Sequence, residues 1–102
     1  MVGTKQVDRL VFDLCALLFA HPTDRLTALV ELEKDGVELF CFADLSRKML
    51  MNALMETSML GYFDDIFYPD KLDVMSGDDL RMLSDSYWIR LPYQVDYQSL
   101  RT

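Results

Sequence analysis

Aspartates that stand next to apolar runs are the side chains of this sequence best suited to chemistry. Asp13 interrupts one long apolar run and Asp44 directly follows another, while Asp78 and Asp79 stand together later in the chain. Carboxylates at the ends of successive parallel strands lie close in space although they are distant in sequence. Such a group can hold Mg²⁺, which prefers oxygen ligands, and one carboxylate can attack a phosphoryl group. Asp13, Asp78 and Asp79 are therefore candidate metal ligands, with Asp13 as the candidate nucleophile.

The first half of the chain alternates between strand and helix patterns. The nearly continuous apolar run at 8–19 predicts a central strand that is covered on both faces. A turn signal at 21–24 supplies Thr23 or Asp24 as a helix cap, and Gly36 is a natural residue to end that helix. The run 37–43 predicts a second strand.

The second half continues this alternation. Asp44 or Ser46 can cap a second helix that extends to about Met59 and closes at Gly61. Further elements are expected as a strand in 62–68, a short helix in 76–83 and a last strand in 87–93. The order predicts an α/β fold, a small three-layer Rossmann-like domain with a short, mainly parallel sheet.

Length and charge limit the possible roles. The 102 residues predict a single domain, 1–102, with a loosely ordered polar tail at 94–102. The net charge of −7 argues against nucleic acid and membrane surfaces as partners. The two cysteines, Cys15 and Cys41, lie in apolar runs as free thiols would, which favours a reduced, cytoplasmic protein. A disulfide between the two neighbouring strands is the alternative.

The order of these features resembles the haloacid-dehalogenase-like (HAD-like) family. Its first motif, an apolar strand followed by Asp-x-Asp-Gly-Thr-Leu, corresponds to Val-Phe-Asp-Leu-Cys-Ala-Leu-Leu at 11–18. Its second motif, a strand that ends in Thr or Ser, corresponds to 42–44. The segment 61–66 is similar to the stretch that leads to the third strand, and 77–79 is similar to the acidic metal motif. The resemblance implies Asp13 as nucleophile and Lys71 as the residue that steadies the phosphate.

Departures from the family pattern fall at the residues that perform the reaction. Cys15 occupies the place of the general acid, and a thiol does not transfer that proton comparably. Ala43 replaces the hydroxyl that would hold the phosphate. Lys71 is too close to Gly77 in sequence for the usual crossover helix, and the cap insertion after the first motif is missing. A disabled phosphatase-like scaffold is the interpretation that these departures favour.

A second apolar face on the second helix points to partner binding. The side that covers the sheet is assigned to Met49, Leu50, Ala53, Leu54 and Thr57. Met51, Met55 and Met59 repeat every four residues and would point elsewhere, as a surface for a protein partner or a homodimer. The aromatic residues expected to extend that surface are Tyr62, Tyr87, Trp88 and Tyr93.

Structural alternatives exist for each of these residues. Asp13 can cap a strand end or pair with an arginine, Asp44 can cap a helix, and Asp78 and Asp79 can belong to a turn and helix start. The methionines can fill the core. The sequence favours a non-catalytic acidic interaction or regulatory module without a cofactor. The alternative is a minimal Mg²⁺-dependent phosphatase or phosphotransferase with an aspartate nucleophile.

Overall fold

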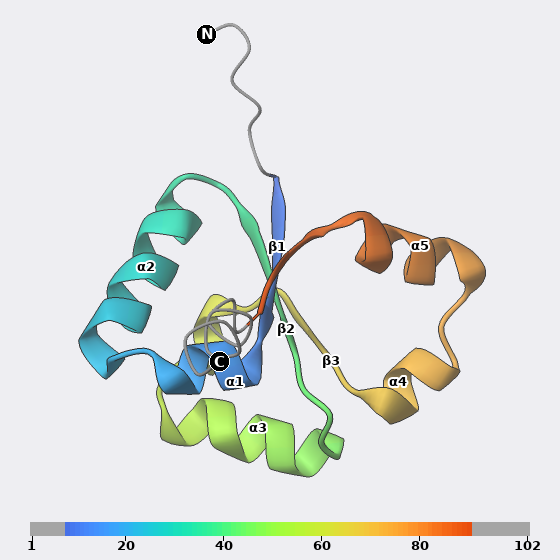
Figure 1. Cartoon of the computed structure of the whole chain (residues 1–102), viewed down its shortest axis with the longest axis horizontal. Helices are drawn as coiled ribbons and strands as arrows, with labels where there is room; N and C mark the ends of the chain where they lie inside the picture. Colours follow the sequence, from blue (N-terminus) through green and yellow to red (C-terminus); the bar gives the residue numbers. More distant parts are fainter. Residues whose placement is uncertain (1–7, 91–102) are drawn as a thin grey trace, which may run out of the picture.

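The computed structural model describes residues 8–90, which form an open sheet flanked by helices (Figure 1). In chain order, the elements are β1 (Arg9–Asp13), α1 (Leu14–Phe19), α2 (Pro22–Lys34), β2 (Glu38–Phe42), α3 (Arg47–Glu56), the 3₁₀ helix η1 (Leu60–Tyr62), β3 (Asp65–Phe67), α4 (Pro69–Asp73), α5 (Gly77–Asp85) and β4 (Tyr87–Ile89). The tail predicted at 94–102 and Tyr93 lie outside the described residues.

The four strands are all parallel and follow the order β3-β2-β1-β4. β1 pairs with β2 in a register that places Val11 beside Phe40 and Asp13 beside Phe42. This confirms the expected adjacent parallel pair. The chain crosses from one edge of the sheet to the other between β3 and β4, through α4 and α5.

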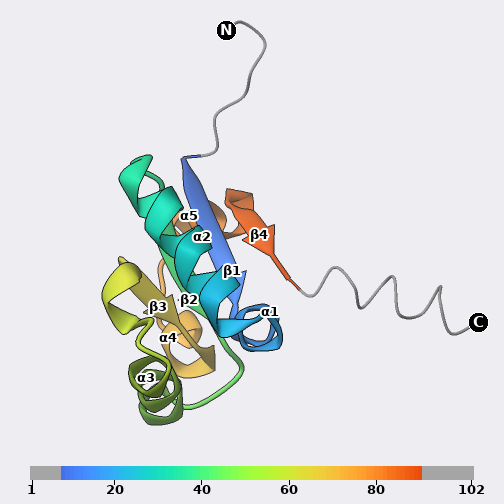
Figure 2. The same ribbon diagram turned by 90° about the vertical axis from the view of Figure 1, so that its left-hand side faces the viewer.

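Alternate side chains of the strands point into two separate cores. One core packs against α1, α2 and α3; its buried members are Leu10, Phe12, Leu14, Leu17, Leu29, Leu39, Cys41, Ala43, Leu50, Leu54 and Met59. The other packs under α4 and α5 and contains Val11, Phe40, Phe67 and Leu83. In Figure 2, α2 lies in front of β1 and α5 lies behind it. The fold is therefore a small three-layer, Rossmann-like α/β domain, as the sequence predicted.

The first strand is shorter than the sequence pattern suggested, because a helix begins inside the apolar run. The Asp13 carboxylate accepts a hydrogen bond from the Cys15 amide at 3.0 Å and caps α1. Leu14 and Leu17, three residues apart, are buried against the core, whereas Leu18 is exposed. The prediction of a strand through 19 was wrong for its second half, since a continuous apolar run also fits one buried side of a short helix.

Side-chain caps fix the starts of the longer helices. Nδ1 of His21 accepts from the Thr23 amide and caps α2, in place of the expected Thr23 or Asp24. Ser46, not Asp44, caps α3 by accepting from the Met49 amide at 3.2 Å. A serine also caps α5, as predicted for the Ser-Gly-Asp-Asp segment at 76–79. Within residues 8–90, no helix has the length and apolar character needed to cross a membrane.

The ends of α2 and α3 share one geometry, a left-handed residue just beyond the helix. Gly36 has φ +78° at the end of α2, and Ser58 has φ +61° at the end of α3. After Ser58 the Met59 amide donates back to the Leu54 carbonyl at 2.9 Å, which completes a Schellman motif. The chain therefore leaves α3 at Ser58, before Gly61, and turns Met59 into the core.

Candidate functional site

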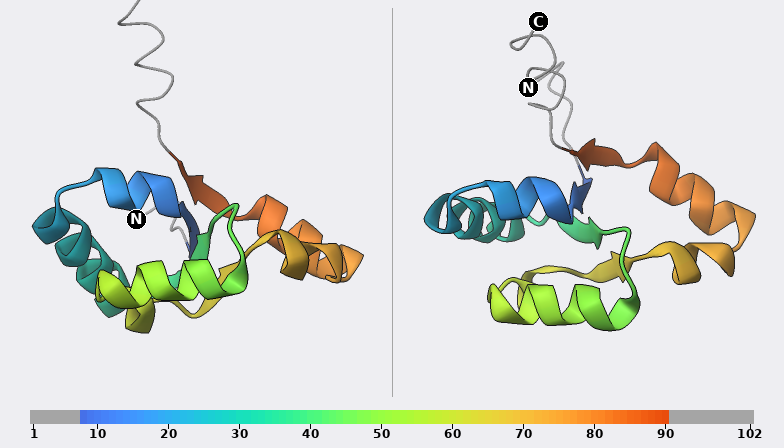
Figure 3. Two further views of the ribbon diagram at one scale, coloured as in Figure 1. Left: turned by 90° about the horizontal axis from the view of Figure 1, so that it is seen from below. Right: turned by 60° about the horizontal axis from the view of Figure 1, so that its bottom comes forward.

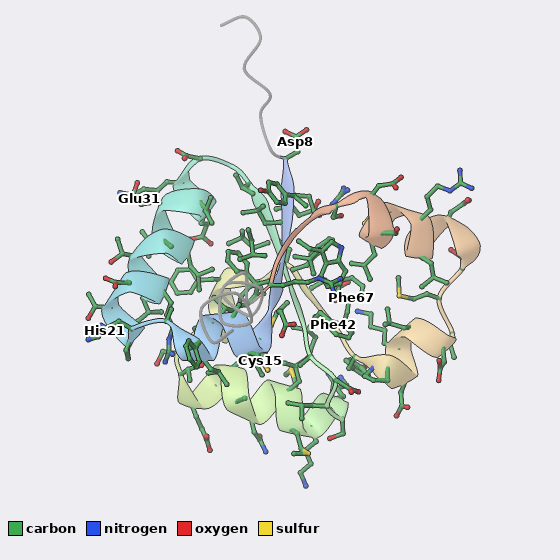
Figure 4. The ribbon with its side chains drawn as sticks, in the orientation of Figure 1. Asp8, Cys15, His21, Glu31, Phe42 and Phe67 are labelled. Atoms are coloured by element: carbon green, nitrogen blue, oxygen red, sulfur yellow. The ribbon has the colours of Figure 1, made fainter. Side chains whose placement is uncertain are left out.

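A hollow of about 270 Å³ lies where β1 and β2 end, at the edge that the sequence predicted for a site. It is lined by Asp13, Leu14, Cys15, Leu18, Phe42, Ala43, Asp44 and Leu45. Cys15 and Phe42 mark this end of the sheet in Figure 4. Seen from below in Figure 3, α1 and α3 stand at the same end. The hollow therefore sits between the first turn of α1 and the loop that leads into α3.

Asp13 and Asp44 supply the two carboxylates of this hollow, but they are differently engaged. Asp13 is half-buried, and its Oδ1 atom is held by the Cys15 amide as the cap of α1. Asp44 is exposed on the loop after β2. Ala43 directly precedes Asp44 in the sequence. It is buried and has no hydroxyl that could hold a phosphate. The wall of the hollow is otherwise mostly apolar, which suits an apolar ligand surface better than an anion.

The two cysteines are free and differ in exposure. Cys15 is exposed in the first turn of α1, next to the hollow. Cys41 lies in β2, beside Phe12, and is fully buried. Burial, and to a lesser extent the negative charge of Asp13, raise the pKa of the Cys41 thiol to about 12. Cys41 is therefore a protonated core residue at neutral pH, with no part in nucleophilic chemistry.

Lys71 is engaged away from the hollow. Its Nζ atom pairs with the Asp65 carboxylate at 2.5 Å and donates to the Ile66 carbonyl at 2.9 Å. The same ammonium lies 4.5 Å from the centre of the Phe67 ring. These contacts tie α4 to β3, so the residue predicted to steady a phosphate has a structural role here.

Asp78 and Asp79 lie in the first turn of α5, where both are exposed. The Asp79 amide donates to Ser76 at 3.1 Å, so this pair belongs to a helix start, where acidic residues are favoured by the helix dipole. Within residues 8–90, no group of three His, Cys, Asp or Glu side chains is placed to hold a metal ion. The structure does not bring Asp13, Asp78 and Asp79 together, because Asp13 lines the hollow whereas Asp78 and Asp79 lie at the start of α5.

The three methionines that the sequence assigned to a partner surface, in and just after α3, lie in three different environments. Met55 is 60% exposed, Met51 is half-buried, and Met59 is 0% exposed. Met59 was wrongly assigned to the partner surface, because the chain has already left the helix at Ser58 and Met59 closes over its end. Met49 is 56% exposed, so its assignment to the sheet-facing side was also wrong. The outward apolar residues of α3 are Met49 and Met55.

Two features were missed by the sequence analysis. Leu18 and Phe19 are exposed on α1. This exposed side was not predicted, because the run was interpreted as a strand. A second hollow, of about 190 Å³, lies between α1, α2 and β4 and includes Arg25. Nη1 of Arg25 donates to the Leu17 carbonyl at 3.3 Å and so closes the end of α1, while its Nε atom is buried without a hydrogen-bond partner in the described part of the chain. The helix pattern that begins at Leu14 would have revealed the first feature.

No protein-family model, no curated protein and no solved structure matches the chain.

Proposed function

We propose that the chain is a non-catalytic, acidic interaction or regulatory module on a degenerate HAD-like scaffold. The observation that carries this proposal is the exposed apolar surface of α3, formed by Met49 and Met55. Full burial of an exposed methionine side chain contributes about 1.5–3 kcal/mol, and more than half of each of these two side chains is exposed. Methionine is also enriched in the cores of protein interfaces. A protein partner that covers α3 would recover part of that free energy.

The chemistry of the hollow supports a non-catalytic role. Cys15 stands where the HAD-like pattern has its general acid, and Ala43 stands where it has a hydroxyl. Lys71 is engaged with Asp65 and does not line the hollow. A phosphoryl transfer depends on groups that position and neutralise the phosphate, and these positions lack them.

A cytoplasmic location belongs to the same proposal. Both cysteines are free, and disulfides are rare where thiols are kept reduced. The net charge of −7 opposes binding to nucleic acid or to anionic lipid. A protein surface is thus the partner class that the proposal retains.

The enzymatic alternative is favoured by the placement of Asp13 at the end of β1. An assay for turnover of a generic phosphomonoester with Mg²⁺ tests the proposal against that alternative. We expect no turnover above background by the purified full chain. The Asp13→Asn variant is the matched control, because asparagine caps a helix about as well as aspartate but is not a nucleophile. Turnover by the wild type that Asp13→Asn abolishes would establish the alternative, with Asp13 as the nucleophile.

A further inference from the structure

The exposed residues of α3 are arranged symmetrically about Asn52. Lys48 lies four residues before Asn52 and Glu56 four residues after it, while Met49 and Met55 lie three residues to either side. All five are exposed, and the buried Leu50 and Leu54 face the core on the opposite side of the helix. The outer side of α3, shown at one border of the molecule in Figure 4, thus has charges of opposite sign at equal distances from its midpoint.

These charges are unfavourable for the helix that carries them. α3 begins with Arg47 and Lys48, has Glu56 in its last turn, and has no acid in its first turn or base in its last. The helix dipole favours the reverse arrangement, which α2 and α5 follow with acidic first turns. Among residues 8–90, no ion pair compensates Lys48 or Glu56. Within the described part of one copy, this arrangement costs stability and gains no ion pair in return.

We propose that α3 binds the α3 helix of a second copy of this chain, antiparallel and across a two-fold axis at Asn52. This inference rests on the proposed interaction function and names its partner. The two-fold axis places Lys48 of each copy opposite Glu56 of the partner subunit, and the two Asn52 amides face each other, where they can exchange hydrogen bonds. The positive first turn of each helix then lies beside the negative end of the other, so the dipole and the side-chain charges agree.

The geometry of helix packing suits this pairing. Lys48, Asn52 and Glu56 form one i, i+4 row, and contacts between such rows of two helices belong to the commonest class of helix packing, with axes crossing at about −50°. Met49 and Met55 flank the row on its two sides, so both are covered in the dimer. A heterologous partner would need its own matching pattern, whereas this row is complementary to itself.

The size of the face sets the strength of the contact. α3 has ten residues, which span about 15 Å at 1.5 Å per residue. Such a face belongs to the low end of interface sizes, where association is weak and transient. The net charge of −7 on each copy adds long-range repulsion. The dimer should therefore form reversibly with concentration.

Charge-swap variants of the full chain test this pairing by sedimentation velocity over a concentration series. Lys48→Glu and Glu56→Lys each place like charges opposite one another twice in the homodimer, and each should weaken self-association about tenfold or more. Both changes improve the match to the dipole of α3, so each variant should melt no lower than the wild type. An equal mixture of the two variants should associate as the wild type does, because every pair in the mixed dimer is opposite in sign. The Lys48→Glu/Glu56→Lys double variant should also recover.

Three results would overturn the pairing. A wild type that sediments as a monomer at all concentrations excludes the second copy as partner. Single variants that associate like the wild type place the contact away from α3. Loss in the single variants without recovery in the mixture assigns α3 to a contact of different geometry. None of these results bears on the phosphomonoester assay, so failure of the dimer and failure of the non-catalytic proposal are separately visible.

Discussion

Asp13 lies at the end of a strand and also caps the helix that follows it. Its Oδ1 atom accepts a hydrogen bond from the Cys15 amide, and this cap allows α1 to begin immediately after β1. A nucleophilic carboxylate in this position would need its free oxygen directed at a phosphate that other residues hold. Among residues 8–90 the cap is present, while Ala43 has no hydroxyl to hold a phosphate and Lys71 is paired with Asp65.

The two thiols should differ sharply in reactivity. At neutral pH in the folded protein, a thiol-alkylating reagent should modify Cys15, which is exposed, and leave Cys41, whose pKa is raised to about 12 by burial. Intact-mass spectrometry should show one adduct in buffer and two in denaturant. The Cys15→Ser variant is the control and should take up no label while folded. Rapid labelling of Cys41 in that variant would mean that β2 opens readily.

At the level of the elements, the ends of the helices determine where side chains go. α2 and α3 both end with a left-handed residue and a Schellman motif, but only α2 has glycine at that position. A left-handed conformation costs an ordinary residue about 1–2 kcal/mol, which glycine avoids. α3 therefore carries backbone strain at Ser58 that α2 avoids at Gly36.

Ser58→Gly should stabilise the protein by about 0.5–1 kcal/mol, because glycine relieves this strain at a modest cost in unfolded-chain entropy. Thermal unfolding should show a melting temperature about 2–8 °C higher. Gly36→Ala is the reciprocal variant and should lower the melting temperature, although an added Cβ meets no atom within 4 Å, since only the φ of +78° opposes it. A Ser58→Gly protein that is no more stable than the wild type would contradict the strain at α3.

The sequence predicted those elements whose signals are local. The paired parallel strands followed from two apolar runs, and the start of α5 followed from Ser76 with its acidic first turn. The strand ends also correctly placed Asp13 and Asp44 beside one hollow. The start of α1 was missed, because Asp13 in an apolar run has the same appearance as a strand residue and as a helix cap.

The remaining errors concern residues whose position depends on the path of the chain. Serine is not a residue type that predicts a left-handed conformation, so the end of α3 at Ser58 could not be predicted. The four-residue spacing of the methionines therefore gave no sign that Met59 is buried. The distances from Asp13 to Lys71 and to Asp78 depend on how α4 and α5 cross to the far edge of the sheet. Those crossings are set by packing, which a single sequence records only indirectly.

Across the whole molecule, the two sides of the sheet are unequally supported. Among residues 8–90, eleven buried residues form the core beneath α1, α2 and α3, whereas four form the core beneath α4 and α5. Both edge strands, β3 and β4, contain only three residues each. Regions with few buried apolar contacts open at lower free energy than the rest of a domain. The unit of α4, α5 and β4 should therefore open before the unit of β1, β2 and α3.

Native-state hydrogen exchange followed by NMR should resolve this order. Amides of α5 and β4 should exchange faster than those of β1 and β2, whose slowest members should report global unfolding.

Two leucine-to-alanine variants provide a matched comparison, because Leu83 and Leu50 are both buried but belong to different cores. Leu83→Ala should speed exchange mainly in α4, α5 and β4. Leu50→Ala should lower global stability by about 2–5 kcal/mol and speed exchange of the slowest amides in both units. Equal protection of β4 and β1 in the wild type would instead mean that the sheet and both helical layers unfold as one unit, in which case the smaller core contributes more per residue than the larger one.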